Sequence, residues 1–195
     1  MNSKDVVQLF SGGALADYLG SKLHAASNVV EQISKVELLA CSAETLAEQI
    51  VGQLSISPLV IHPEQMQRQQ TATKISKEVD ASDYGMPVKR WVMVNGNKMH
   101  YIIPFTGDAA LWHLRTSGPS FDHAAAIDAV QSRLTLTLQN TTDVESPWYQ
   151  RQMEQTLDQI NLRIGDQAQA LKQFHPQLAT TVKGALALRL RQVKS

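Results

Sequence analysis

Apolar positions spaced three and four residues apart dominate the first part of the chain. From residue 14 to 39 they fall on one face of an amphipathic helix. A further helix is predicted over 43–54, with Ser42 as its N-cap. Residues 3–10 are predicted to form a short opening helix, so this whole part of the chain is expected to be helical.

The middle of the chain changes to patterns that are typical of β-strands. Residues 90–104 are predicted to form a hairpin with Asn95-Gly96 at its tip, because a type I′ turn needs positive φ at both central positions. Residues 66–79 are polar but contain Thr, Ile and Val, which favours an exposed strand. Residues 80–87 are predicted to form a loop. A further strand is predicted over 55–61, at the start or the edge of the sheet.

Residues 123–139 carry two conflicting signals. The alanine-rich stretch 123–130 favours a helix by composition, because Ala leads the helix scale. The alternation of Leu and Thr over 134–138 is typical of a half-buried strand. Because a strand needs a neighbour, we prefer a second hairpin with its turn at 131–133, and the helical alternative for 123–130 stays open.

The last part of the chain returns to helical spacing. Ser146 and Pro147 fit the N-cap and first position of a helix, where the missing N–H of proline costs nothing. Apolar residues then recur at heptad-like intervals over 147–174. The His175-Pro176 step is predicted to end that helix, since the residue before proline avoids the α region. A last helix over 177–193 completes a helical hairpin.

Together these elements predict an α+β fold with N-terminal helices, a small and mainly antiparallel sheet built on hairpin 90–104, and a long C-terminal helical hairpin. We expect an α+β domain over residues 1–143. We expect residues 144–195 to form the helical hairpin tail, either within the same domain or as an appendage. At 195 residues the chain is long enough to bury a core without disulfides.

Charge balance and cysteine content exclude several classes of protein. Eighteen basic and 18 acidic residues give zero formal charge, which argues against a surface coated in positive potential. The single Cys41 rules out an intramolecular disulfide and a cysteine-based zinc site, and we expect it to be a packed thiol. The sequence has no signal-peptide pattern and no apolar run near the roughly 20 residues that cross a bilayer. These observations predict a cytoplasmic protein with no membrane partner.

One candidate chemistry is that of a metal-dependent nuclease. Glu78, Asp80 and Asp83 cluster ahead of the predicted hairpin, and carboxylates of this kind can hold a catalytic metal. The Asp…Glu-x-Lys arrangement of restriction-like nucleases is absent, so we prefer a solvated strand and an acidic loop. The histidines lack metal-binding spacing, and no phosphate-binding loop or nucleophile elbow occurs. We therefore expect no cofactor, and an enzyme is the less favoured interpretation.

A second candidate is nucleic-acid binding by the basic end of the last helix. The cations there are Lys183, Arg189, Arg191 and Lys194. Cations near a helix C-terminus also stabilise the helix dipole, and we prefer that explanation. Nucleic-acid binding is kept as the alternative function.

Residues 101–117 contain the run Tyr-Ile-Ile-Pro-Phe-Thr-Gly-Asp, followed by a short helical stretch and an Arg-containing loop. This segment resembles one in uncharacterised bacterial proteins, where Ile-Pro-Phe-x-Gly-Asp leads into a short helix and an Arg-Pro-Ser loop. This chain departs from that pattern at Thr116, where the pattern has Pro. The resemblance implies helices, a central sheet and a long helical tail, sometimes followed by a nuclease or other effector domain. It also implies a bacterial sensor or adaptor, in a setting such as phage defence.

The leading hypothesis from the sequence is a non-enzymatic interaction module. Its candidate binding residues are Asp108, Trp112 and Arg115, together with the outer face of helix 147–174. That helix would be about 40 Å long at 1.5 Å per residue, which exceeds what a small sheet covers. Its apolar seam could therefore meet a protein partner or a second copy of the chain. The alternative is that the seam packs within the chain.

Overall fold

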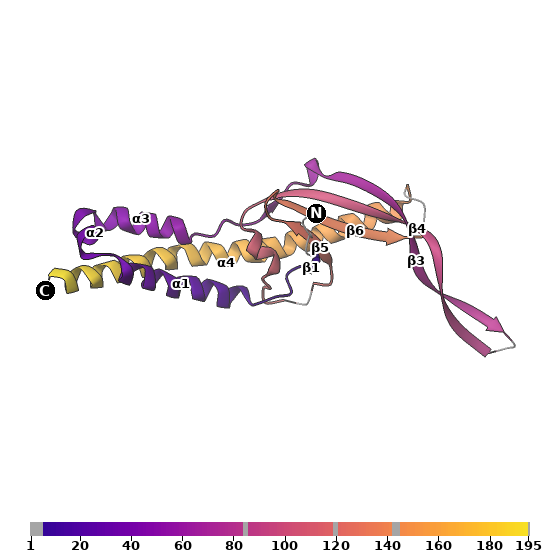
Figure 1. Ribbon diagram of the computed structural model, residues 1–195, viewed down its shortest axis with the longest axis horizontal. Helices are drawn as coiled ribbons and strands as arrows, with labels where there is room; N and C mark the ends of the chain where they lie inside the picture. The colour runs from indigo at the N-terminus through magenta and orange to yellow at the C-terminus, as the bar shows by residue number, and fades with distance from the viewer. Residues whose placement is uncertain (1–5, 84–85, 119–120, 142–144, 195) are drawn as a thin grey trace. The chain divides into compact units, whose positions relative to one another are not determined.

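The computed structural model describes residues 6–83, 86–118, 121–141 and 145–194, and within these it describes residues 80–83, 86–88 and 194 by their backbone alone. It combines helices with an antiparallel sheet and a long C-terminal helix (Figure 1). The predicted α+β class is therefore confirmed.

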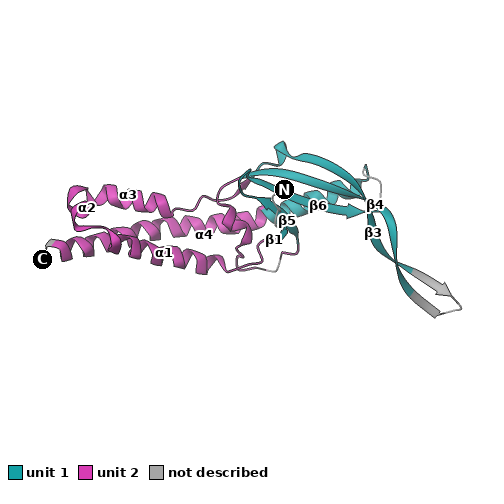
Figure 2. Cartoon of the chain, in the orientation of Figure 1, with its two compact units in different colours: residues 1–7, 61–105, 123–160 teal, residues 8–60, 106–122, 161–195 magenta. Residues whose placement is uncertain are grey.

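The chain divides into two compact units, and each is assembled from segments that are distant in sequence (Figure 2). The sheet unit comprises residues 1–7, 61–105 and 123–160. The helical unit comprises residues 8–60, 106–122 and 161–195. The C-terminal helix α4 (Pro147–Lys194) contributes residues to both units.

In the described part of the chain, one sheet has the strand order β1-β5-β6-β4-β2, and β3 also pairs with β4. Its longest strands are the antiparallel pair β3 (Gln67–Asp83) and β4 (Met86–Thr106). The remaining strands are β1 (Val6–Gln8), β2 (Val60–Ile61), β5 (Ala124–Asp128) and β6 (Arg133–Asn140). The antiparallel β5–β6 pair confirms the predicted second hairpin and excludes a helix over 124–128.

Alternating side chains build the core of the sheet unit. Along β4 the buried residues are Met99, Tyr101, Ile103 and Phe105, which share one face because side chains of a strand alternate. Leu134 and Leu136 of β6 are buried in the same alternating manner. The first turns of α4 add Tyr149, Met153 and Ile160 to this set of buried residues.

The predicted hairpin over 90–104 is wrong. Strand β4 runs unbroken through Asn95 and Gly96, which pair with Lys74 and Thr73 of β3. A Cβ on Gly96 would overlap the side chain of Ile75 and would lie 2.9 Å from the backbone carbonyl oxygen of Asn140. The glycine therefore permits a close approach within the sheet instead of a turn. The predicted loop over 80–87 is also wrong, because the strands extend to Asp83 and resume at Met86.

The helical unit contains α1 (Leu15–Gln32), α2 (Lys35–Ala40) and α3 (Ala43–Leu54). The predicted helix after Ser42 is confirmed, and the Ser42 hydroxyl accepts a hydrogen bond from the Thr45 amide at 3.1 Å. The opening helix is wrong where the chain is described, because residues 6–8 form strand β1. Cys41 is exposed instead of packed, since it forms the extended C-cap of α2.

The predicted C-terminal helical hairpin is also wrong, because α4 continues through Pro176 as one helix. Buried side chains keep their phase across the proline, from Leu171 and Phe174 to Leu178, Val182 and Leu186. Proline inside a helix costs about 3 kcal/mol. Each fully buried large apolar side chain contributes about 1.5–3 kcal/mol. The buried residues beyond Pro176 therefore outweigh its cost and hold the helix together.

Candidate interaction site

The segment around Asp108, predicted as a contact surface, serves mainly to hold the fold. Asp108 caps the short 3-10 helix η2 (Ala109–His113) by accepting a hydrogen bond from the Ala110 amide at 2.9 Å. Trp112 is completely buried and packs with Phe10 at a centroid distance of 5.6 Å. Trp112 is therefore a core residue and not a surface contact.

The backbone conformation and close contacts of Gly107 explain why the Ile-Pro-Phe-x-Gly-Asp run has a glycine at this position. Its φ is +101°, a backbone conformation that residues other than glycine rarely adopt. A Cβ at this position would also overlap the carbonyl of Pro58. The next amide, that of Asp108, donates to the carbonyl oxygen of Ser57 at 3.0 Å. These contacts give the run a structural role in the helical unit.

Arg115 is exposed, and its backbone fixes the start of α1. Its amide donates to the carbonyl oxygen of Gly13 at 3.1 Å, and its carbonyl accepts from the amide of Leu15 at 2.9 Å. Gln167 of α4, which is almost fully buried, connects α4 to η2 and to the residue that follows it. Its Nε2 donates to the carbonyl oxygens of Leu111 and Leu114, each at 2.9 Å.

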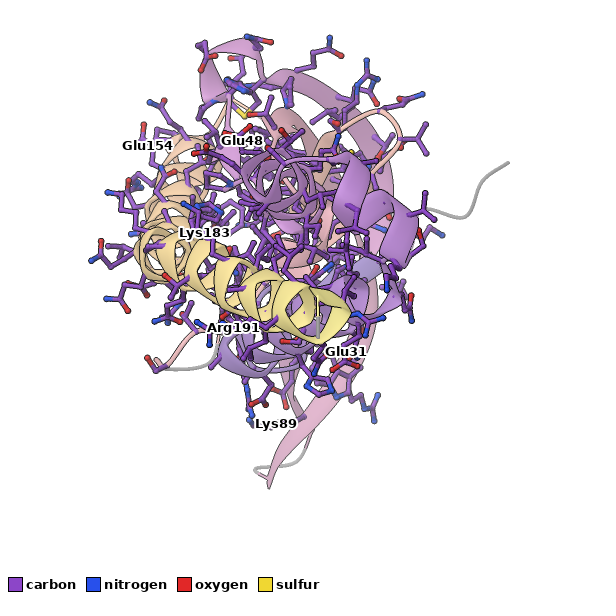
Figure 3. The ribbon with its side chains drawn as sticks, turned by 90° about the vertical axis from the view of Figure 1, so that its left-hand side faces the viewer. Glu31, Glu48, Lys89, Glu154, Lys183 and Arg191 are labelled. Atoms are coloured by element: carbon purple, nitrogen blue, oxygen red, sulfur yellow. The ribbon has the colours of Figure 1, made fainter. Side chains whose placement is uncertain are left out.

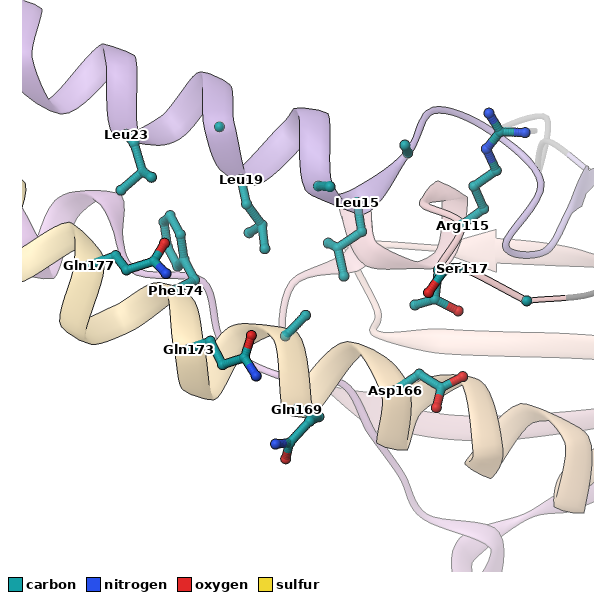
Figure 4. A pocket seen from close by; sticks show the side chains of 16 residues that line it. Leu15, Leu19, Leu23, Arg115, Ser117, Asp166, Gln169, Gln173, Phe174 and Gln177 are labelled. Atoms are coloured by element: carbon teal, nitrogen blue, oxygen red, sulfur yellow. The ribbon is translucent and has the colours of Figure 1, made fainter.

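A groove of about 860 Å³ lies beside Arg115, between α1 and the later part of α4 (Figure 4). Leu15, Leu19 and Phe174 form its apolar wall. A row of amides one helical turn apart lines it from α4: Gln169, Gln173 and Gln177. Among the described residues that line the groove, the ionisable side chains are Arg115 and Asp166. This lining suits hydrogen bonding better than acid–base or nucleophilic chemistry.

The apolar seam of α4, predicted as a contact face over 147–174, lies largely inside the protein. Met153, Ile160, Leu171 and Phe174 are all buried. Among the large apolar residues described in this range, Leu162 is the one that is largely exposed, at 70%. The seam is therefore used for packing within the chain.

The basic end of α4 belongs to a helical unit that also carries exposed acids. Lys183 and Arg191 project from α4 into solvent, and Glu31 and Glu48 come from α1 and α3 (Figure 3). Lys183 lines a small cavity together with Glu44. The guanidinium of Arg189 lies 3.5 Å from the Gln192 amide oxygen, and the side chain of Lys194 lies outside the described residues. These acids offset the positive charge that a nucleic-acid surface would need.

The acidic candidates Glu78, Asp80 and Asp83 all lie in β3. Glu78 pairs with Lys89 of β4 at 3.4 Å, and the Lys89 side chain is largely exposed whereas that of Glu78 is 39% exposed. The side chains of Asp80 and Asp83 fall outside the described residues. Among the residues whose side chains are described, no three His, Cys, Asp or Glu side chains gather as a metal-ligand set.

The most unusual surface lies on a part of β3 and β4 that the sequence singled out only for its acidic residues, and not as a surface that binds a protein. Strand β6 ends beside β4 at the pair Asn97–Asn140, whereas the β3–β4 pairing continues to Asp83 and Met86. Residues 73–83 and 86–96 thus form a two-stranded ribbon, hereafter the arm, which extends beyond the other strands of the sheet (Figure 1). An isolated two-stranded ribbon is marginally stable in water at best.

The arm exposes apolar side chains on both faces. Trp91 is 70% exposed and Met93 is 62% exposed, and both lie on one face with Glu78 and Ser76. The opposite face carries Val92, Val94 and Ile75, of which Val92 is exposed and the other two are half-buried. An exposed Trp beside an exposed Met is typical of a contact surface.

The arm also presents an unpaired strand edge. The Phe105 amide donates to the carbonyl oxygen of Ser132, which directly precedes β6, whereas the carbonyl oxygen of Pro104 accepts from the His62 amide on the opposite side. Odd-numbered residues of β4 therefore direct N–H and C=O towards the β6 side, because these groups alternate along a strand. Beyond Asn97 no strand of the described chain lies on that side. The backbone groups of Lys89, Trp91, Met93 and Asn95 thus form a free edge.

Comparisons with protein-family models, with curated proteins and with solved structures find no match. Within the described residues, no helix is both long enough and apolar enough to cross a membrane.

Proposed function

We propose that this protein is a non-enzymatic interaction module that binds another protein chain through the arm. The observation that carries the proposal is the arm's free β4 edge, flanked by the exposed side chains of Trp91 and Met93. A free edge binds an extended segment by adding it as a further strand. The exposed Trp and Met supply the apolar contact that such main-chain pairing lacks.

Two features of the arm and one of the rest of the fold support this role. Its length commits many residues to a ribbon that has little core of its own, which is costly unless a partner covers it. Long exposed edges are normally blocked or covered, because they aggregate. The buried seam of α4 and the capping role of Asp108 also leave the predicted contact surfaces engaged within the fold.

The test compares wild type with the double variant W91T/M93T. Thr retains β-propensity, so the ribbon is kept while its large apolar side chains are removed. The matched control is L162Q/L188Q, which replaces two exposed leucines of α4. Association is measured by sedimentation velocity on the purified chain and by quantitative co-purification from cells.

The proposal predicts that W91T/M93T weakens association by at least about 30-fold, as expected for loss of about 2 kcal/mol at a contact hot spot. The control should retain wild-type association. Equal association of wild type and W91T/M93T, or equal loss in the control, would contradict the proposal.

A further inference from the structure

We infer that the occupant of the arm's free edge is a second copy of this chain, paired antiparallel through β4 about a twofold axis at Val92. This inference rests on the proposed function and names its partner. It follows from the direction of the backbone groups, from the charges along the edge and from the placement of the apolar side chains.

The alternating direction of the backbone N–H and C=O groups along β4 restricts the registers in which two copies can pair. The outward-pointing groups belong to the odd-numbered residues Lys89, Trp91, Met93 and Asn95, so odd residues must pair with odd residues of the second copy. A twofold axis that relates two copies of β4 must then pass through a residue and not between two residues. Each odd–odd pair exchanges two hydrogen bonds, and the four strands form the order β3-β4-β4-β3.

The charges along β4 then exclude one possible position of the twofold axis. An axis at Trp91 would place the two Arg90 residues two positions apart, or about 7 Å along the strand. That distance lies inside the Debye length of about 10 Å at 0.1 M salt, so the two cations would repel. An axis at Val92 separates the Arg90 pair by about 14 Å and the Lys89 pair by about 20 Å. The whole arm carries four basic and three acidic residues, so two arms do not repel strongly.

Apolar complementarity selects the axis at Val92 over one at Met93. With the axis at Val92, Trp91 lies opposite Met93 of the second copy, and Met93 lies opposite Trp91. This arrangement joins four exposed apolar side chains on one face and gains a sulfur–aromatic contact at each pair. On the other face Val92 meets its own symmetry mate. An axis at Met93 would instead place Trp91 opposite Asn95, leaving the indole against a polar side chain.

An isologous pairing of this kind is self-complementary and closed, so it yields dimers and not filaments. It also converts two ribbons of marginal stability into one four-stranded sheet.

The experiment uses the full chain with Cys41→Ser, which removes the only native thiol. Into this background Val92→Cys and Val94→Cys are introduced separately. The two sites are valines on the same strand and the same face, and they differ in exposure, since Val92 is exposed and Val94 is half-buried. At the twofold axis the Val92→Cys thiols face each other across a non-hydrogen-bonded pair. Its Cα separation of about 4.5 Å lies within disulfide range. The Val94→Cys thiols would lie about 14 Å apart along the strand.

Mild oxidation should shift the Val92→Cys protein to a disulfide-linked dimer, while Val94→Cys stays monomeric on a non-reducing gel. Equal cross-linking of both variants would overturn the inference, because it would indicate random collision. Absence of a dimer from both variants would also overturn it. In that case the proposed function is judged separately: if W91T/M93T still abolishes co-purification of a different protein, the arm is an interaction surface whose occupant is not a second copy.

Discussion

The hydroxyl of Tyr149 donates to the carbonyl oxygen of Asn97 at 3.0 Å, at the residue where β4 leaves β6 and enters the arm. It also lies 3.3 Å from the carbonyl oxygen of Asn140, the last residue of β6. One side chain near the start of α4 thus ties together the two strand segments that separate at this point. Tyr149 is almost fully buried, so water cannot easily replace it.

Replacing Tyr149 with Phe should destabilise the protein while leaving the ring packing intact. The half-buried carbonyls of Asn97 and Asn140 would each lose one donor, and a typical hydrogen bond contributes about 0.5–1.5 kcal/mol net. The free energy of unfolding in urea measures the effect. Tyr18→Phe is the control, because the Tyr18 ring is partly exposed and lies beside Lys22. We expect less than about 0.5 kcal/mol for the control, and an equal loss in both variants would refute the assigned role.

Burial raises the pKa of Tyr149 above its ordinary value, and the hydrogen bond to Asn140 opposes part of that rise. Burial likewise raises the pKa of Tyr101, against an opposing effect of Arg68. A group with a raised folded-state pKa adds stability below its unfolded pKa, here about 10. That stability is lost as pH rises through the folded pKa. Unfolding free energies above pH 10 should therefore fall in wild type and fall less in Tyr149→Phe. A parallel decline in the two proteins would argue against a titrating Tyr149.

Gln167 should be needed to hold η2 in place. Replacing it with Leu keeps the volume and removes both bonds to the carbonyl oxygens of Leu111 and Leu114. We expect a loss of about 1–3 kcal/mol, measured by chemical denaturation. Gln169→Leu is the control, since Gln169 is exposed in the groove. A neutral Gln167→Leu variant would mean that its hydrogen bonds add nothing net to stability.

The effect of Pro176→Ala on stability distinguishes a continuous helix α4 from a helical hairpin with its turn at Pro176. In a continuous helix the new N–H can bond the carbonyl of Lys172, so the variant should be more stable by up to about 3 kcal/mol. In a hairpin the proline would lie at the turn, and replacing it would be neutral or destabilising. Thermal unfolding of the two proteins decides between these outcomes.

The sequence was most informative where spacing and caps agreed. The helix after Ser42 and the strand pair that includes 134–138 follow from local patterns that tertiary packing reinforces. It misled where one residue type serves two purposes. Gly96 fits a turn, but here it makes room for Ile75 across the ribbon, which only the paired structure reveals.

Local sequence patterns also gave wrong predictions at Pro176 and Cys41, for different reasons. Pro176 signals a helix end locally, yet the buried stripe keeps its phase beyond it, and that phase was visible in the sequence. Cys41 follows apolar residues but falls at the end of α2, where the backbone becomes extended and the side chain is exposed. The arm cannot be predicted from local patterns in the sequence, because its length depends on where β6 ends. A retrospective signal was the run Trp91-Val92-Met93-Val94, which lacks the polar alternation of a one-sided strand.

NMR-detected hydrogen exchange of wild type, from dilute to concentrated solution, tests most directly whether the arm's free edge is the contact. The amides of Trp91 and Met93 point away from β3, whereas those of Val92 and Val94 point towards it. In dilute solution the odd-numbered amides should exchange fast, because no strand of the described chain covers them. Association should slow exchange at Lys89, Trp91, Met93 and Asn95 and leave the exposed face of α4 unchanged. The account would be contradicted if, as the protein concentration rises, exchange slowed at amides of α4 while these four amides continued to exchange fast.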